Sequence, residues 1–417
     1  MPPREAPQRQ RRIAYIVRDA LPPTRADLLT LFGDELPRYG IEAELVGQAG
    51  DSATHPARTP AWRSGGLHAV GSLGSRFASV LTPMWDALGL LRARRGARLE
   101  CIQVRDKIAS ALLGRLAASL LGVPFVYWMS FPIVEGYRQR RDHVRRSRRR
   151  LAWLAHALRA AASHHILYRL VLPAAHHVFV QSAAMAAALA ARGVPSARIT
   201  AVPMGIDAAR FARAAIDPSV DPRLARRRVV LYLGRVARSR QSDFLLEVAD
   251  QLRADVPDLL MVIAGDAPSA EEMAWMRAEV ARRGLDTHVL LTGWLPQAAA
   301  LGFAVRAEVG LSPIPRGALF DVSSPTKLIE YMALGIPSVV NDIPDQADVI
   351  AASGAGLCVA MEAPLFAAAV RRLLHDPGFA AAMGSRGPAW VAAHRTYTIL
   401  GRLVADSYAG ILPPRGA

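Results

Sequence analysis

Positions 323–337 read Ser323-Ser324-Pro325-Thr326-Lys327-Leu328-Ile329-Glu330-Tyr331-Met332-Ala333-Leu334-Gly335-Ile336-Pro337. Ser324 is a suitable N-cap residue and Pro325 a suitable first helical residue, so a helix is predicted to begin here. Apolar residues then recur at helical spacing and predict a face that packs inward, whereas Lys327 and Glu330 fall on the opposite, polar side. The apolar run 338–340 follows, and this order of helix and strand predicts an α/β fold.

The rest of the C-terminal half repeats this alternation of apolar runs and helical patterns. Strands are predicted at 229–233, 259–264, 288–291, 309–311 and 338–340. Helices are predicted between most of them, for example at 243–253 and 270–283. Alternating elements of this length are typical of a doubly wound parallel sheet.

The N-terminal half shows a second series of the same kind. Its strands are predicted at 13–17, 42–46, 101–104, 125–128, 177–180 and 199–202. The segment 108–129 is apolar enough to be considered as a membrane span, but it contains Arg115, Gly122 and Pro124, so a helix, a turn and a buried strand are expected. The series lapses between 203 and 222, where Pro, Gly and Asp cluster, and the joint between two domains is expected there.

Composition limits the class of protein. The 417 residues are 52% hydrophobic and 21% charged, which is enough material for two or three well-packed domains. The two cysteines, Cys101 and Cys358, lie far apart and indicate neither a disulfide framework nor a thiolate metal site. Residues 1–4 are polar and lack the apolar core of a signal peptide, so a cytoplasmic protein is expected.

The net charge of +16 predicts an anionic partner. The basic segment from Arg138 to Arg150 holds eight arginines in thirteen positions. A solvated helix face is one interpretation of this segment, and a face for an anionic membrane surface or a phosphorylated lipid is another. Nucleic acid is not expected as a partner, because no helix-turn-helix, ribonucleoprotein or zinc pattern accompanies the charge.

The start of the helix predicted after position 325 is suited to an anionic ligand. The backbone amides of Thr326 and Lys327 have no partner within a helix, and they lie at the positive end of its dipole, where a phosphate binds favourably. Glu330 lies about 7.5 Å along the axis from Pro325, so its carboxylate can accept hydrogen bonds from a ribose. The alternative interpretation is an ordinary amphipathic helix with a surface glutamate.

Glycine follows three of the predicted strands, at the position where ligands bind in open α/β sheets. Gly234 and Arg235 follow the strand 229–233, and Arg240 comes five residues later. Two guanidinium groups there can neutralise a diphosphate, although paired arginines in an arginine-rich chain are usually surface residues. The other two turns place glycine in the same way, as Gly265 and as Gly293-Trp294.

In the order of these motifs the chain resembles family 4 of the glycosyltransferases, retaining enzymes with the two-domain GT-B fold. The resemblance rests on Pro203-Met204-Gly205-Ile206-Asp207, Tyr232-Leu233-Gly234-Arg235, Ala264-Gly265-Asp266, Thr292-Gly293-Trp294 and the stretch from Pro325 to Pro337. It implies an α/β fold of two Rossmann-like, doubly wound parallel-sheet domains facing across a cleft. It also implies an acceptor-binding domain at 1–208, a donor-binding domain at 209–395 and, at 396–417, a helix that returns to the first domain.

The resemblance further implies transfer of a sugar from a nucleoside-diphosphate donor, with retention and with no metal or other cofactor. The expected acceptor is a saccharide or a polyprenyl-diphosphate-linked saccharide. The expected setting is exopolysaccharide, capsule or lipopolysaccharide synthesis in the cytoplasm, at the inner face of the plasma membrane.

Family roles can be carried over residue by residue. Arg235 and Arg240 resemble the basic pair at the diphosphate, and Glu330 resembles the ribose-binding glutamate. The cradle for phosphate and sugar corresponds to Ser323, Ser324, Pro325, Thr326, Lys327 and Leu328. Positions around the nucleoside correspond to Gly234, Gly265, Gly293 and Trp294.

The chain also departs from the family pattern. The family has paired glutamates eight positions apart, and Val322, with Asp321 beside it, occupies the first of these positions. Ser130 stands where a histidine commonly follows the strand, and the loop 18–23 replaces a glycine-rich loop. A branch of the family with Ser-Pro-x-Lys-x-x-Glu-Tyr-Met-Ala resembles this sequence more closely.

Other functions are weighed against this one. A nucleotide-sugar epimerase of the same fold and a non-catalytic nucleotide-sugar-binding protein remain alternatives. An NAD-dependent dehydrogenase would require Gly-x-Gly-x-x-Gly after the first strand, and that loop is absent from the sequence.

Overall fold

The computed structural model describes residues 10–50, 62–75, 78–146 and 150–414. The chain forms two compact units, which we call unit 1 (Met1–Pro203 with Tyr397–Ala417) and unit 2 (Met204–Thr396). The polar start at residues 1–4 and part of the basic segment, residues 147–149, lie outside the described residues.

The described part of unit 1 contains one parallel sheet of seven strands in the order β3-β2-β1-β4-β5-β6-β7. The strands are β1 (Arg11–Ile16), β2 (Ile41–Ala49), β3 (Leu67–Ser72), β4 (Cys101–Arg105), β5 (Phe125–Met129), β6 (His177–Val180) and β7 (Ile199–Ala201). From Ile13 to Ile16, β1 is a continuous, buried apolar run because both faces of the sheet are covered.

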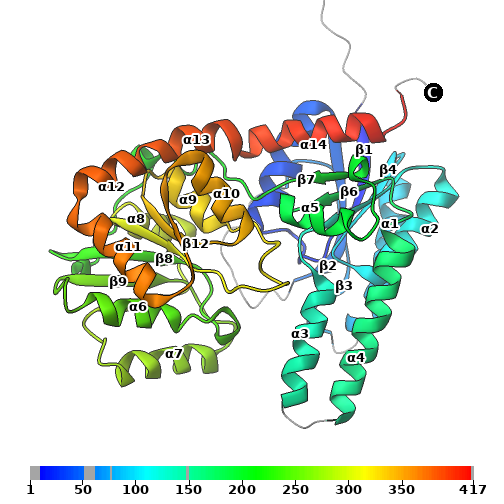
Figure 1. The fold of residues 1–417 in the computed structure, drawn as a ribbon. Helices are drawn as coiled ribbons and strands as arrows, with labels where there is room; N and C mark the ends of the chain where they lie inside the picture. The colour runs from blue at the N-terminus through cyan, green and yellow to red at the C-terminus, as the bar shows by residue number, and fades with distance from the viewer. Residues whose placement is uncertain (1–9, 51–61, 76–77, 147–149, 415–417) are drawn as a thin grey trace, which may run out of the picture. The chain divides into compact units, whose positions relative to one another are not determined.

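Helices cover both faces of this sheet (Figure 1). The helical segments of unit 1 are η1 (Asp27–Glu35), η2 (Leu36–Tyr39), α1 (Ala78–Gly96), α2 (Ile108–Leu121), α3 (Ile133–Arg146), α4 (Arg150–His165), η3 (Ile166–Val171), α5 (Ala183–Ala190), η4 (Ser196–Arg198) and α14 (Tyr397–Ile411). One apolar core lies between the sheet and the pair η1 and α14, and it includes Tyr15, Phe32, Trp128 and Phe179. Figure 1 shows α3 and α4 as an antiparallel hairpin that extends away from the sheet.

The described part of unit 2 contains a parallel sheet of six strands in the order β10-β9-β8-β11-β12-β13. The strands are β8 (Arg228–Leu233), β9 (Leu259–Ala264), β10 (Val289–Gly293), β11 (Val309–Ser312), β12 (Ser338–Asn341) and β13 (Gly356–Val359). Successive residues of β8 point to opposite faces, so Val230 and Tyr232 join one core while Leu231 and Leu233 join the other.

The helical segments of unit 2 connect these strands. They are η5 (Arg213–Ala215), η6 (Pro222–Leu224), η7 (Arg238–Arg240), α6 (Phe244–Leu252), α7 (Ala270–Arg282), α8 (Gln297–Ala304), α9 (Thr326–Ala333), α10 (Pro344–Ser353), α11 (Ala363–His375), α12 (Pro377–Gly384) and α13 (Arg386–His394). The first and last segments of unit 2 pair directly, because Ile206 N donates a 2.9 Å hydrogen bond to Arg395 O and Ile206 bridges Thr396.

The predicted two-sheet α/β class is confirmed, and the structure adds two strands. β3 and β13 are edge strands, and neither was predicted. The apolar pattern of β3 is broken by His68, Gly71 and Ser72. β13 has only four residues and begins with a glycine. An edge strand is covered less completely than a central one, so its sequence carries a weaker apolar signal. The segment 108–129 forms α2, a turn at Gly122 and β5, as expected.

Candidate functional site

The three glycine turns meet at the carboxyl edge of the unit 2 sheet. Leu233 pairs with Ala264 across β8 and β9, and Gly234 N donates a 3.0 Å hydrogen bond to Ala264 O. Gly265 forms a bridge with Gly293. Gly265 has a φ of +154°, and a Cβ atom there would lie 2.0 Å from the carbonyl oxygen of Gly234. This close approach of two backbones requires glycine.

Helix α9 begins beside this edge, but its N-terminus differs from the prediction. The helix starts at Thr326 with Pro325 in the N-cap position, so Ser324 is not the cap. The buried Ser324 Oγ instead donates a 2.9 Å hydrogen bond to Asp345 Oδ2. It also accepts hydrogen bonds from Met204 N at 3.0 Å and Arg395 Nη1 at 3.2 Å. Ser324 therefore fixes the approach to α9 through partners in distant parts of unit 2.

Tyr331 ties α9 to the sheet. Its buried hydroxyl accepts a 2.7 Å hydrogen bond from Leu233 N and lies 3.2 Å from the Leu311 carbonyl oxygen, to which it can donate. A Cβ atom at Gly310 would lie 2.5 Å from the Tyr331 ring, so the small residue admits the aromatic side chain. These contacts hold α9 against the carboxyl ends of β8 and β11.

Lys327, which was predicted on the polar side of the helix, is buried. Its Nζ atom lies 5.1 Å from the centre of the Tyr232 ring. Burial is the largest cause that lowers the pKa of Lys327 to about 7, Arg240 lowers it further, and Glu330 opposes the shift. Glu330 is partly buried, and burial raises the pKa of its carboxyl despite the charge of Lys327. The structure thus brings the buried Lys327 and the partly buried Glu330 together as an electrostatically coupled pair.

The two arginines predicted at the diphosphate differ in their surroundings. Arg240 ends η7, is half-buried, and its charge lowers the pKa of Lys327, so the structure brings these two cations together. Arg235 is exposed, immediately after Gly234. The Cζ atom of Arg238, between them in the sequence, lies 4.8 Å from the centre of the Trp275 ring. Trp294 is 49% exposed at the neighbouring turn.

The carboxylate next to Val322 already has partners. Asp321 Oδ1 accepts hydrogen bonds from Arg316 Nε at 2.8 Å and from Gly317 N at 3.1 Å. Arg316 also pairs with Asp342 at 2.8 Å. Asp321 therefore belongs to an ion-pair network in this loop.

Sequence reasoning missed a buried polar cluster in unit 1, at the carboxyl ends of β4 and β5. Arg105 donates from Nη2 to Asp27 at 2.6 Å and from Nε to Ser130 Oγ at 3.2 Å. Ser130 Oγ in turn donates to Asp106, which also accepts from Ser130 N at 3.0 Å. Burial alone would raise the pKa of Asp27, but Arg105 and Arg25 hold it well below its ordinary value. The sequence signal that could have predicted this cluster was the presence of charged residues at the end of a buried strand.

A second buried cluster lies beside the first. Lys107 Nζ donates to both oxygens of Asp86, at 2.8 and 3.0 Å, and to Gln48 at 2.9 Å. Ser110 Oγ donates to Asp86 at 2.6 Å. Since burial is nonetheless the largest cause acting on Lys107, its pKa is lowered.

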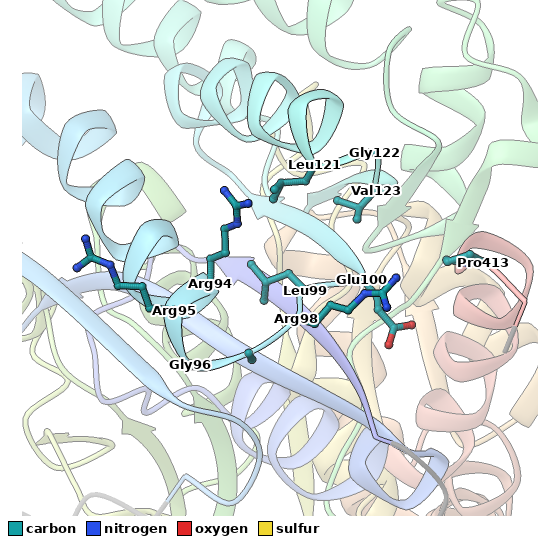
Figure 2. Close-up of a pocket in the computed structure, with 11 residues that line it drawn as sticks. Arg94, Arg95, Gly96, Arg98, Leu99, Glu100, Leu121, Gly122, Val123 and Pro413 are labelled. Carbon is teal, nitrogen blue, oxygen red and sulfur yellow. The ribbon is translucent and has the colours of Figure 1, made fainter. Parts of the chain in front are cut away.

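One cavity lies away from these residues. It has a volume of about 600 Å³ and is lined by the ends of α1 and α2 and by the start of β4. Figure 2 shows Arg94, Arg95 and Arg98 around it. Leu99, Glu100 and Val123 of this lining lie at the amino ends of β4 and β5 in unit 1. Among the described residues, no cluster of three His, Cys, Asp or Glu side chains suits a metal ion. In the same part of the chain, no helix is both long and apolar enough to cross a bilayer.

Comparison with known proteins agrees with this arrangement. Residues 227–376 match the family model described as glycosyl transferases group 1, and residues 30–205 match a glycosyl transferase 4-like domain. A GDP-mannose-dependent α-(1-6)-phosphatidylinositol monomannoside mannosyltransferase of Mycolicibacterium smegmatis is 29% identical over 52% of this chain and 57% of its own. An α-D-kanosaminyltransferase of Streptomyces kanamyceticus is 27% identical over 44% of this chain and 45% of its own. The aligned regions thus span about half the length of these curated relatives.

Solved structures show the same fold. The Anabaena protein HepE, in complex with UDP and glucose, superposes with a TM-score of 0.68 at 14% identity, over 96% of this chain and 100% of its own. Sucrose-phosphate synthase of Thermosynechococcus elongatus superposes with a TM-score of 0.69 at 18% identity, over 96% and 99% of the two chains.

Proposed function

Because the chain belongs to the group 1 glycosyltransferases of family 4, we propose that it transfers a sugar from a nucleoside-diphosphate donor to an acceptor hydroxyl, with retention. The convergence of Lys327, Arg240 and the glycine turns at the start of α9 carries this proposal. A buried ammonium is costly without an anion, and the charge of Glu330 offsets only part of the effect that burial has on Lys327. A diphosphate supplies the missing charge.

Each group has a role in this proposal. The diphosphate binds at the amides of Thr326 and Lys327, with the positive end of the helix dipole behind them. Lys327, Arg240 and Arg235 stabilise the charge that develops on the departing nucleoside diphosphate. Glu330 accepts hydrogen bonds from the ribose. The acceptor hydroxyl attacks from the face that the leaving group vacates.

The proposed reaction needs no metal, because the three basic side chains supply the charge that a divalent cation would otherwise provide. Transfer should therefore continue at an unchanged rate in excess EDTA. Complete loss of transfer in EDTA, with recovery on addition of Mg²⁺ or Mn²⁺, would show that these side chains are not sufficient.

The acceptor is proposed to be a saccharide or a polyprenyl-diphosphate-linked saccharide. The mycobacterial relative is named for a phosphatidylinositol mannoside acceptor and a GDP-mannose donor, which supports a lipid-linked acceptor and places GDP-mannose first among donors to test. The proposed setting is exopolysaccharide, capsule or lipopolysaccharide synthesis at the cytoplasmic face of the membrane. Arg138, Arg140 and Arg141 of α3 belong to the basic segment that would face anionic lipid there.

The decisive experiment measures transfer and hydrolysis with GDP-mannose, UDP-glucose and UDP-N-acetylglucosamine, and assigns the product anomer by NMR. Arg240→Ala should lower kcat/KM for the donor about 100-fold. Arg238→Ala is the matched control, since that guanidinium lies over Trp275, and it should keep the wild-type value.

Three results would contradict the proposal. Binding of a nucleotide sugar with no turnover would indicate a non-catalytic protein. Conversion of the donor to its epimer without an acceptor would indicate an epimerase. Equal kcat/KM values for Arg240→Ala and the wild type would contradict the assignment of the donor site.

A further inference from the structure

The outward face of α1 is apolar. Its exposed residues follow one another at helical spacing, as Val80, Met84, Leu88 and Leu91, and Val80 is 75% exposed. The only acidic residue of α1, Asp86, points the other way and is buried against Lys107. A solvent-facing helix usually presents charged residues, so this exposed apolar face indicates an interaction surface.

The outward face of α2 is apolar as well. Leu113, Leu116 and Leu120 recur at helical spacing and are exposed, Leu116 by 57% and Leu120 by 79%. α2 contains one charged residue, Arg115, which is also exposed. The opposite side of α2 carries Gly114, whose missing side chain admits Val104 of β4.

The two apolar faces point in the same direction. α1 and α2 pack beside each other on one side of the unit 1 sheet. Gly89 of α1 lies against Val46 of β2, and Gly114 of α2 lies against Val104 of β4, so each helix turns its other side away from the same sheet. Together they form one surface, the α1–α2 face, with outward residues Val80, Met84, Leu88, Leu91, Leu116 and Leu120.

Arginines border this face at one end. Arg94 and Arg95 lie in the last turn of α1, and with Arg98 they line the cavity of about 600 Å³ between the ends of α1 and α2. Figure 2 shows the Arg94 side chain extending toward Leu121 at the end of α2. Glu100 is the one acidic residue lining that cavity. Three guanidinium groups against one carboxylate leave the cavity suited to an anionic group.

We propose that the α1–α2 face docks on an anionic phospholipid bilayer, with its leucines among the acyl chains and Arg94, Arg95 and Arg98 at the lipid phosphates. Apolar residues beside arginines fit an anionic membrane surface, where buried apolar area and charge attraction add. A second copy of the chain fits less well. A two-fold interface would pair this face with itself, and neither α1 nor α2 has an exposed acidic residue to pair with the arginines.

This inference deepens the membrane setting in the proposed function but does not depend on sugar transfer. It concerns a surface distinct from the α3–α4 hairpin. The hairpin can contribute charge through Arg138, Arg140 and Arg141, whereas the α1–α2 face contributes the apolar contact that salt does not screen.

The test is vesicle flotation of the full chain. Wild-type protein should float with vesicles of mixed phosphatidylglycerol and phosphatidylcholine, and a fraction should remain bound at high salt. Leu116→Glu with Leu120→Glu should lower the partition coefficient at least about tenfold, because two leucines no longer enter the bilayer. Leu365→Glu is the matched control, an exposed leucine of α11 in unit 2, and it should float like the wild type. Arg94→Gln with Arg95→Gln should lose the preference for phosphatidylglycerol over phosphatidylcholine alone.

Several outcomes would overturn the proposal. Unchanged flotation of the double-leucine variant, or equal loss in Leu365→Glu, would remove the α1–α2 face as the contact. A vesicle-free wild-type dimer that the double variant converts to a monomer would identify a second copy as the occupant. Donor hydrolysis, measured on the same proteins without vesicles, should be equal in all of them. Absence of both transfer and hydrolysis in all of these proteins, with flotation as expected, would contradict the proposed function and leave the membrane contact standing.

Discussion

The Nζ atom of Lys327 lies 5.1 Å from the centre of the Tyr232 ring, so the one lysine of unit 2 is held over an aromatic face at the end of β8. The ring quadrupole attracts the ammonium, but the contact replaces only part of the hydration that burial removes. The lowered pKa of Lys327, about 7, follows from this imbalance and makes its charge sensitive to pH near neutrality.

Donor use should depend on pH through Lys327. The side chain is charged below its pKa of about 7 and neutral above it, and the charged form favours a diphosphate. We therefore expect kcat/KM for the donor to fall as pH rises above about 7, since this ratio reports groups of the free enzyme. Lys327→Arg should remove that alkaline limb, because guanidinium stays charged. If kcat/KM of Lys327→Arg fell above pH 7 as in the wild type, another group would be responsible for the pH dependence.

Lys327 should also lower the free energy of unfolding. Its pKa is lowered from 10.5 in the unfolded chain to about 7 in the folded one, so the penalty is full below pH 7 and disappears as pH rises toward 10.5. Lys327→Met should therefore raise the free energy of unfolding by about 1–2 kcal/mol at pH 6, with a smaller gain at pH 9. Urea unfolding at both pH values measures this. A destabilised variant at pH 6 would show that Lys327 has a stabilising partner.

The close approach of the Gly234 and Gly265 backbones should leave no space for a side chain at position 265. Gly265→Ala would place Cβ 2.0 Å from Gly234 O at a φ of +154°, so the turns must separate. We expect a loss of about 2–4 kcal/mol in unfolding free energy and weaker nucleotide binding by calorimetry. Gly96→Ala is the control, because no heavy atom lies within 4 Å of a Cβ at that position. Equal stability of the two variants would mean that the turns can separate freely.

The Asp27–Arg105 pair should stabilise unit 1 only while both charges are present. Asp27→Asn leaves the buried Arg105 without its closest counter-charge, and we expect a loss of about 3–5 kcal/mol. Since the pKa of Asp27 is lowered, the wild-type contribution is present at neutral pH and decreases as pH falls below about 4. Glu42→Gln, which breaks a more exposed pair with Arg12, should cost less than about 1 kcal/mol in the same urea titrations.

The sequence was sufficient for most of the strands but less so for the site. Central strands such as β8 and β9 are continuous apolar runs, and their periodicity is unambiguous. The burial of Lys327 could not be read from helical spacing, because it depends on Tyr232, a residue of another element. The role of Ser324 was missed for a similar reason. A serine before a helix is usually a cap, yet here Asp345 and Arg395 lie close enough to engage it.

For α1 and α2, the sequence does not show which way the apolar face of each helix points. Leucines in a helix predict a buried stripe, and the spacing of Leu113, Leu116 and Leu120 is that of a core face. Only the packing of Gly114 against β4 reveals that the helix is turned so that these leucines face outward. Glycine and alanine on the inward side allow α2 to lie close to the sheet, and the larger residues remain outside.

The pairing of Ile206 with Arg395 and Thr396 has a consequence for protein engineering. It joins the start and the end of unit 2 by a 2.9 Å backbone hydrogen bond, so residues 204–396 form an insertion whose two ends lie together. Such a segment behaves as a cassette, since it can be excised at one place and rejoined without stretching the chain. Exchanging residues 204–396 for the corresponding segment of a relative would therefore test directly whether this segment determines the sugar donor, as proposed.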